Sequence, residues 1–126
     1  MRELLDSLKK AHDTVIGRYD IHYQILKLMP EQTLEVLLYI YNAIWNGGDF
    51  PSQWREATII PIPKAGTNLS YASKYLLIAV TSCIYETFER MVNTRLVWDL
   101  EYHAILTSHQ SGFRKHRSTA DQLIKL

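Results

Sequence analysis

The stretch that decides the fold of this chain reads Ala57-Thr58-Ile59-Ile60-Pro61-Ile62-Pro63-Lys64-Ala65-Gly66. Three β-branched residues in a row predict a buried strand, and the two prolines remove the ladder donors at its far end. The strand is therefore expected to leave its sheet near Pro61 and to continue as an extended arm with Lys64 at its tip. A lysine on such an arm suits a phosphate group, whereas an edge strand ending in a solvated lysine is the simpler interpretation.

The sequence on either side of this stretch carries strand and helix signals. The apolar run from Leu76 to Val80 predicts a second buried strand that pairs with the first. Apolar residues at helical spacing predict helices over Met1 to His12, Ile21 to Leu28, Pro30 to Trp45 and Ile84 to Leu100. The predicted fold is α+β and helix-rich, with a small two- or three-stranded antiparallel sheet.

Several residues are predicted to begin or end these helices or to stabilise the turns between them. Asp20 is the expected N-cap of the second helix, Thr81 or Ser82 that of the longest one, and Asn46-Gly47-Gly48 is a strong helix stop. Phe50 and Trp54 are expected to anchor a turn. On the longest helix, the charged residues Glu89, Arg90 and Arg95 are interpreted as a solvated face.

Length and composition limit the possible classes of protein. The 126 residues fit one domain, 47% of them are apolar, and the formal net charge of +1 gives no global field that would attract nucleic acid. A single cysteine, Cys83, excludes an internal disulfide and suits a reducing compartment. No signal peptide or membrane-spanning run is evident, so an intracellular location, in cytoplasm or nucleus, and no membrane partner are expected.

The segment from Ser108 to Gln122 contains the densest group of cations, Arg114-Lys115-His116-Arg117. Ser118 and the acidic residue three positions later, Asp121, predict a helix start after this basic loop. Basic side chains and free backbone donors together suit phosphate, and Phe113 beside them suits stacking on a base. An ordinary charged turn with Phe113 in the core is an equally good interpretation.

Other chemistry finds little support in the sequence. Neither a pair of carboxylates in a cleft motif nor a Walker-type glycine loop is present, and the five histidines lack a metal-ligand spacing. RNA cleavage by His109 and His116 is disfavoured because nothing in the sequence orients either ring.

Five ordered motifs together resemble one family of enzymes. They are Leu38 to Trp45, Gly48 to Trp54, Ile60 to Lys64, Thr81 to Cys83 and Gln110 to Lys115. This order and spacing resemble the amino-terminal, fingers part of the reverse transcriptase of non-LTR, LINE-type retrotransposons, most closely those of arthropods. The resemblance covers residues 14–126 and leaves residues 1–13 as an N-terminal helix outside it.

The resemblance implies a role for each matched residue. Lys64 would lie over the phosphates of the incoming nucleotide, and Gln110, Gly112, Phe113 and Arg114 would lie along the template and nucleotide side. Lys115 and Arg117 of the same basic loop are predicted from their charge to bind nucleic acid beside them. A further motif, Thr14-x-x-Gly17-x-x-Asp20, resembles the one that precedes the first fingers helices. The implied partners are an RNA template and primer DNA.

The departures from the family pattern are equally specific. The family usually has Tyr-Arg-Pro-Ile where this chain has Tyr75-Leu76-Leu77-Ile78, and Leu76 cannot hold a phosphate as arginine does. The palm, with the aspartates that bind Mg²⁺ in the complete enzyme, does not occur in these 126 residues. The expected protein is an RNA-directed DNA polymerase by family that is inactive alone, without a cofactor of its own and with weak non-specific RNA binding. The alternative is a non-catalytic RNA-binding or protein-interaction remnant.

Overall fold

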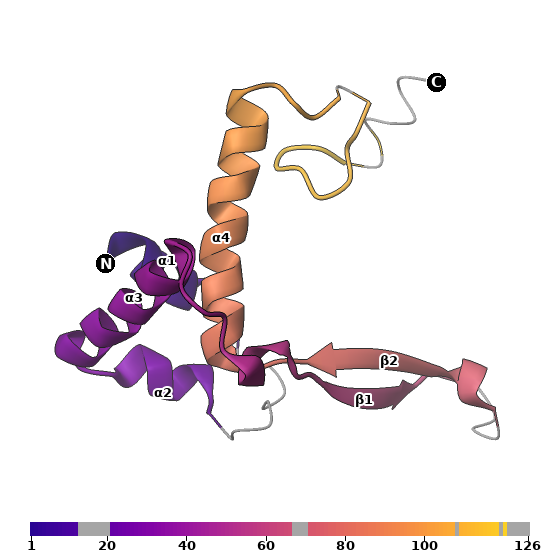
Figure 1. Cartoon of the computed structure of the whole chain (residues 1–126). Helices are drawn as coiled ribbons and strands as arrows, with labels where there is room; N and C mark the ends of the chain where they lie inside the picture. The colour runs from indigo at the N-terminus through magenta and orange to yellow at the C-terminus, as the bar shows by residue number, and fades with distance from the viewer. Residues whose placement is uncertain (13–20, 67–70, 108, 119, 121–126) are drawn as a thin grey trace. The chain divides into compact units, whose positions relative to one another are not determined.

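The computed structural model describes residues 1–12, 21–66, 71–107, 109–118 and 120. It divides into two compact units, Met1–Met91 and Val92–Leu126. The helices are α1 (Arg2–Lys9), α2 (Tyr23–Leu28), α3 (Glu31–Trp45) and α4 (Cys83–Tyr102), with short 3-10 turns at Ser52–Arg55 and Ala72–Lys74 (Figure 1). The strands β1 (Thr58–Pro63) and β2 (Tyr75–Val80) form a two-stranded antiparallel sheet. The predicted α+β class is confirmed.

The core of the first unit is made by its helices. In Figure 1, α1 and α3 lie beside the first part of α4. Each helix contributes apolar side chains to one buried cluster, namely Leu4, Leu8, Ala11, Tyr23, Leu26, Leu34, Tyr41, Cys83 and Met91. The helices therefore cover one another's apolar stripes, as their sequence periodicity predicts.

Polar groups within this core are paired. The Tyr41 hydroxyl donates to the Ile84 carbonyl at 2.6 Å, and the Tyr23 hydroxyl donates to the Glu86 carboxylate at 2.6 Å. Thr87, which is fully buried, donates to the Cys83 carbonyl one turn earlier at 2.7 Å. These bonds join α2 and α3 to α4 without leaving a buried donor unsatisfied at these positions.

Arg90 corrects the prediction of a solvated face on α4. Its guanidinium donates to the Ser7 carbonyl of α1 at 3.0 Å and lies 5.4 Å from the centre of the Tyr23 ring. It also donates to the Tyr23 hydroxyl at 3.4 Å, so hydrogen bonds and a cation–π contact from this side chain join three helices. Helical periodicity places Arg90 beside the apolar stripe, but only the packed neighbours decide what it contacts.

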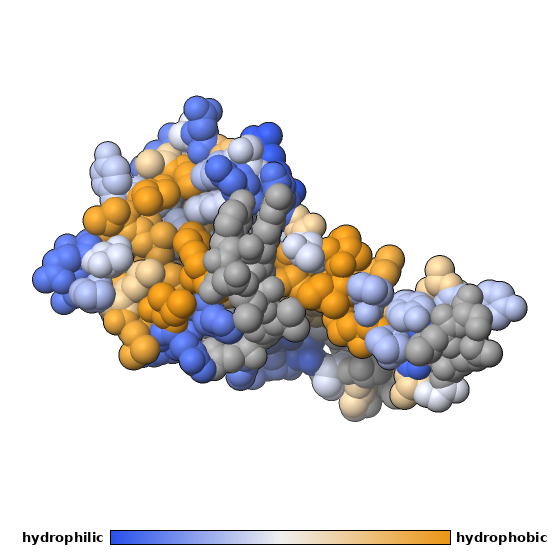
Figure 2. Space-filling view, turned by 90° about the horizontal axis from the view of Figure 1, so that it is seen from below, coloured by the Kyte–Doolittle hydropathy of each residue, from blue (hydrophilic) through white to orange (hydrophobic). Residues whose placement is uncertain are grey.

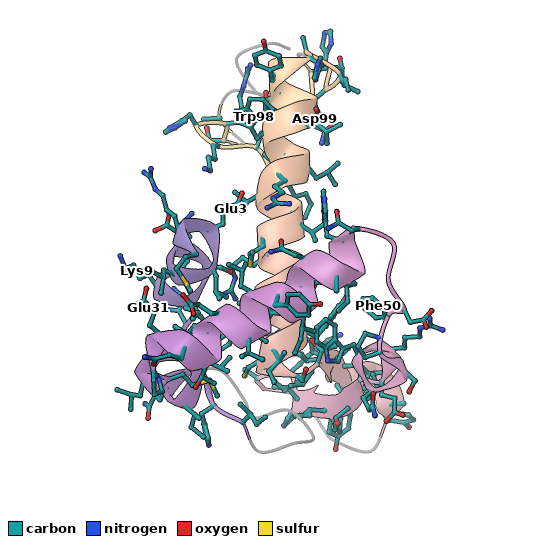
Figure 3. The ribbon with its side chains drawn as sticks, turned by 60° about the vertical axis from the view of Figure 1, so that its left-hand side comes forward. Glu3, Lys9, Glu31, Phe50, Trp98 and Asp99 are labelled. Atoms are coloured by element: carbon teal, nitrogen blue, oxygen red, sulfur yellow. The ribbon has the colours of Figure 1, made fainter. Side chains whose placement is uncertain are left out.

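The aromatic anchors after α3 are confirmed. Phe50 and Trp54 lie 5.7 Å apart and edge to face, and both contact Tyr85 of α4. Trp54 also contacts Tyr41 and Phe88 at ring-centre distances of 6.0 and 5.8 Å. The turn around Phe50, marked in Figure 3, is therefore packed onto both α3 and α4.

The predicted helix boundaries are partly confirmed. Ser82 accepts the Tyr85 N–H at 3.2 Å, and α3 ends at Trp45 with Asn46 as its C-cap, before Gly47, whose φ of +93° favours glycine. The predicted cap at Asp20 is wrong, because α2 begins at Tyr23 with His22 as its N-cap. Pro30 likewise precedes α3 instead of being its first residue.

The hairpin contradicts the prediction of a strand that leaves its sheet at Pro61. Pairing continues through Pro61 opposite Leu77 and Pro63 opposite Tyr75. The Lys64 N–H donates to the Lys74 carbonyl, so alternation along β1 directs the nitrogens of Pro61 and Pro63 away from β2. Because both strands are edges, these prolines remove no ladder hydrogen bond.

The prediction that both strands are buried is also wrong. Val80 alone is buried among the residues of β1 and β2. Register places one exposed set, Ile62, Leu76 and Ile78, on one face and another, Ile59 and Leu77, on the opposite face. Figure 2, which views the molecule from one side, shows hydrophobic surface along the hairpin.

Candidate nucleic-acid interface

The first candidate residue, Lys64, directly follows β1. Its backbone continues the ladder to Lys74, and its ammonium donates to the Ser73 carbonyl at 3.1 Å. The side chain is exposed, and Gly66 turns the chain just beyond it with a φ of +71°. The hairpin therefore carries this cation at its far end, although the strand does not leave the sheet to form the predicted arm.

The remaining candidates lie in the loop that follows α4, within the second unit. Three non-glycine residues of this segment have positive φ: Ala104 at 51°, Phe113 at 60° and His116 at 59°. Such backbone is uncommon for residues with a Cβ and persists where surrounding contacts hold it. Contacts within the second unit are therefore expected to hold this loop.

Arg114 supplies those contacts. Its Nε donates to Glu101 Oε1 at 2.7 Å and its Nη2 donates to Oε2 at 2.6 Å, a bidentate pair with the last turn of α4. Its Nη1 donates to the carbonyls of Thr107 at 2.8 Å and Gln110 at 3.3 Å. The Arg114 side chain is only 11% exposed. One planar guanidinium thus fastens the loop to itself and to α4.

The electrostatics agree with this geometry. The hydrogen bond from Arg114 lowers the pKa of the Glu101 carboxyl, and the same bond raises the pKa of Arg114. The charge of Arg117 also lowers the pKa of the Glu101 carboxyl. Glu101 is a residue that sequence reasoning missed, because nothing in a spacing of thirteen positions identifies it as a partner of Arg114.

The other predicted template residues surround this pair. Phe113 is fully exposed, which corrects the interpretation that it lies in the core. Lys115 and Arg117 are exposed, as are Gln110 and Gly112, while Ser111 between the last two is buried. The loop therefore presents one aromatic ring and two cations outward while Arg114 is turned inward.

Two predictions have no structural outcome here. The motif of Thr14, Gly17 and Asp20 lies outside the described residues, as does most of the helix predicted after Ser118. Lys64 belongs to the first unit, and the basic loop belongs to the second.

The described residues contain neither a group of metal ligands nor a membrane-spanning helix. Within residues 1–12, 21–66 and the later described segments, no three His, Cys, Asp or Glu side chains gather where they could hold a metal ion. No helix of the described chain is both long and apolar enough to cross a membrane.

Comparison with known proteins identifies the family. No protein-family model matches the chain. The chain is 36% identical over 101 residues to a probable RNA-directed DNA polymerase from transposon BS of Drosophila melanogaster, a match that covers 80% of this chain and 11% of that protein. It is 34% identical over 116 residues to the corresponding probable polymerase from transposon X-element, covering 92% of this chain and 13% of that protein.

A third relative agrees with these two. The RNA-directed DNA polymerase from mobile element jockey of Drosophila melanogaster is 30% identical over 116 residues, covering 92% of this chain and 12% of that protein. The chain thus spans only 11% to 13% of the length of these relatives. The resemblance carried by the five sequence motifs is confirmed, and the chain belongs to the family of RNA-directed DNA polymerases of LINE-type mobile elements.

Proposed function

We propose that this chain is a nucleic-acid-binding fingers part of a retrotransposon reverse transcriptase, and that it does not polymerise alone. The observation that carries this proposal is the homology to three named RNA-directed DNA polymerases over most of the chain. The exposed cations Lys64 and Lys115 support it, because they lie within two of the five motifs, and the exposed Arg117 follows in the same basic loop.

Inactivity follows from the part of the family that the motifs match. Two-metal nucleotidyl transfer needs carboxylates that hold Mg²⁺ between the attacking and leaving oxygens. The resemblance assigns those carboxylates to the palm, whereas all five motifs found here belong to the region ahead of it. We therefore assign Mg²⁺ to the complete polymerase and not to this chain.

The expected RNA affinity is modest. Arg114 already uses its donors within the loop, which leaves Lys115 and Arg117 as the phosphate contacts of this loop. Two contacts to a single strand give a slope of log affinity against log salt of about −1.4. The dissociation constant should lie in the non-specific range, on the order of 10⁻⁴ to 10⁻⁶ M.

Two measurements test the proposal. Primer extension on an RNA template with Mg²⁺ and all four nucleotides should give no product from the 126-residue chain, and template-dependent incorporation would overturn the inactive assignment. Fluorescence anisotropy with a labelled single-stranded RNA at several salt concentrations should give the slope of about −1.4.

A matched pair of variants assigns the binding to the loop. Arg117→Ala should flatten the slope by about 0.7, the share of one phosphate contact to a single strand. Lys9→Ala removes an equal charge from the last turn of α1 and should leave the slope unchanged. Equal effects of both variants would mean that attraction is diffuse and that the loop is an ordinary charged turn.

The second candidate function is a protein-interaction module without nucleic-acid binding. The exposed apolar residues on both faces of the hairpin favour it, because monomeric proteins rarely expose contiguous apolar surface of this kind. RNA binding with the expected salt dependence would favour the first function. Absence of RNA binding at low salt would favour the second.

A further inference from the structure

Two aromatic side chains stack on the surface of α4 near its C-terminal end. The ring centres of Trp98 and Tyr102 lie 4.9 Å apart, and the ring planes differ by 13°. The two residues are one helical turn apart, so they project from the same side of the helix. Both remain exposed, Trp98 to 62% and Tyr102 to 70%.

This pair differs from the aromatic cluster of the first unit. The rings around Trp54 pack mostly edge to face or tilted, and they are at least partly buried against the core. Trp98 and Tyr102 instead lie nearly parallel and expose more than half of their surface. Each ring of such a stacked pair has an outer π face, the kind of surface on which a nucleobase stacks.

A basic loop is fastened to the helix next to this pair. Glu101, the residue before Tyr102, accepts the bidentate hydrogen bonds of the inward-facing Arg114, and the charge of Arg117 lowers the pKa of the Glu101 carboxyl. Lys115 and the fully exposed Phe113 belong to the same short loop. The His103 ring lies edge to face with Tyr102 at 5.0 Å and pairs with Asp99 at 3.2 Å, while Figure 3 shows Trp98 and Asp99 projecting from different sides near this end of α4.

We infer that Trp98 and Tyr102 form a stacking platform for bases of single-stranded nucleic acid, with Arg117 and Lys115 contacting neighbouring phosphates. The combination of exposed aromatic rings and adjacent cations is what sequence-independent binding of a single strand requires, since every base has a π face. The inference rests on the proposed function and extends it to two residues that none of the five motifs includes. The bases contribute affinity through the rings, and the phosphates contribute its salt dependence.

The test separates these two contributions. The probe is a labelled, unstructured oligouridine of about 12 nucleotides, within the site sizes known for single-strand binders. The double variant Trp98→Leu with Tyr102→Leu keeps apolar side chains on the helix but removes both π faces. It should bind at least about fivefold more weakly, with an unchanged salt slope.

Two further variants act as controls. Trp98→Phe with Tyr102→Phe keeps both rings and should retain most of the affinity. Tyr39→Leu removes an equally exposed ring, 74% exposed, from α3 in the other unit and should have no effect. Leucine is a good helix former, and circular dichroism will verify that α4 is intact in the leucine variant.

A second measurement does not depend on the leucine variant. Binding of the oligouridine should quench tryptophan emission of the unmodified chain, and the single change Trp98→Phe should remove most of that quenching while retaining binding. An abasic oligomer of equal length and charge should bind the unmodified chain and the leucine variant equally.

The outcomes distinguish the inference from the proposed function. Absence of RNA binding by the unmodified chain would overturn both. Binding with the expected salt slope that is insensitive to the leucine variant would overturn the platform alone, and an apolar protein surface would then be the better partner for these rings. Equal loss in the phenylalanine and leucine variants would also overturn it, because stacking needs only a ring.

Discussion

The helices and the hairpin of the first unit have similarly apolar sequences and opposite surroundings. In α1, α2 and α3, apolar residues such as Leu4, Leu26 and Tyr41 are almost completely buried. In β1 and β2, the comparable residues Ile59, Leu76 and Leu77 are more than half exposed. An apolar composition therefore predicts that a segment favours a buried environment. It does not predict whether other parts of the same chain cover that segment.

The reason is geometric. A helix has one apolar stripe, which three or four neighbouring helices can cover. A strand with apolar residues at successive positions has two apolar faces, and both need a covering layer. A two-stranded sheet has no third layer of its own, and an isolated hairpin of this size is marginally stable at best.

The largest expected effect comes from removing the side chain that connects the helices. Tyr41→Ala deletes a buried ring that contacts Trp54 and Phe88, and it also removes the hydrogen bond to the Ile84 carbonyl. By analogy with other buried aromatic residues, the free energy of unfolding should fall by about 3–5 kcal/mol. Urea unfolding followed by circular dichroism measures the change, and a loss below about 1 kcal/mol would show that the helices do not depend on this ring.

A smaller effect is expected from the tyrosine hydroxyls at high pH. Burial raises the pKa of both Tyr23 and Tyr41 in the folded chain. The protonated hydroxyls therefore stabilise the fold fully below the ordinary tyrosine pKa of about 10, and this stability is lost as the pH rises above that value.

Single substitutions identify the tyrosine responsible. Tyr23→Phe removes the hydrogen bond to Glu86, which should lower the free energy of unfolding by about 0.5–1.5 kcal/mol at neutral pH. It should also make the loss of stability above about pH 10 less steep. The exposed Tyr39 is the matched control, and Tyr39→Phe should not alter the pH dependence. An identical alkaline profile in the Tyr23 variant would contradict the assignment.

The smallest effect is expected in the hairpin. Leu76→Arg places a charge at an exposed position opposite Ile62, and the free energy of unfolding should change by no more than about 0.5 kcal/mol. The same substitution at the fully buried Leu26 should unfold the chain, because an unpaired charge in the core is strongly unfavourable. A large loss of stability with Leu76→Arg would show that the apolar side chains of the hairpin are buried in solution. The difference in burial between the hairpin and the helices would then not exist.

Much of the local structure could be predicted from the sequence. The stop at Asn46-Gly47-Gly48, the cap at Ser82 and the pairing of the two apolar runs follow from residue-level preferences. Family membership was also readable, because ordered motifs do not depend on packing. The cap at Asp20 was predicted wrongly, since α2 begins later than its apolar pattern suggests.

The sequence by itself determined which segments become helices and strands, where most of them end, and the family to which the chain belongs. Only the tertiary structure decided that the hairpin stays exposed, that Arg90 joins α1 to α4, and that Arg114 turns inward to Glu101 while Phe113 points to solvent. The division has a physical cause. Backbone preferences and turn chemistry act between neighbours in sequence, whereas burial and the pairing of long charged side chains depend on groups that only the folded chain brings together.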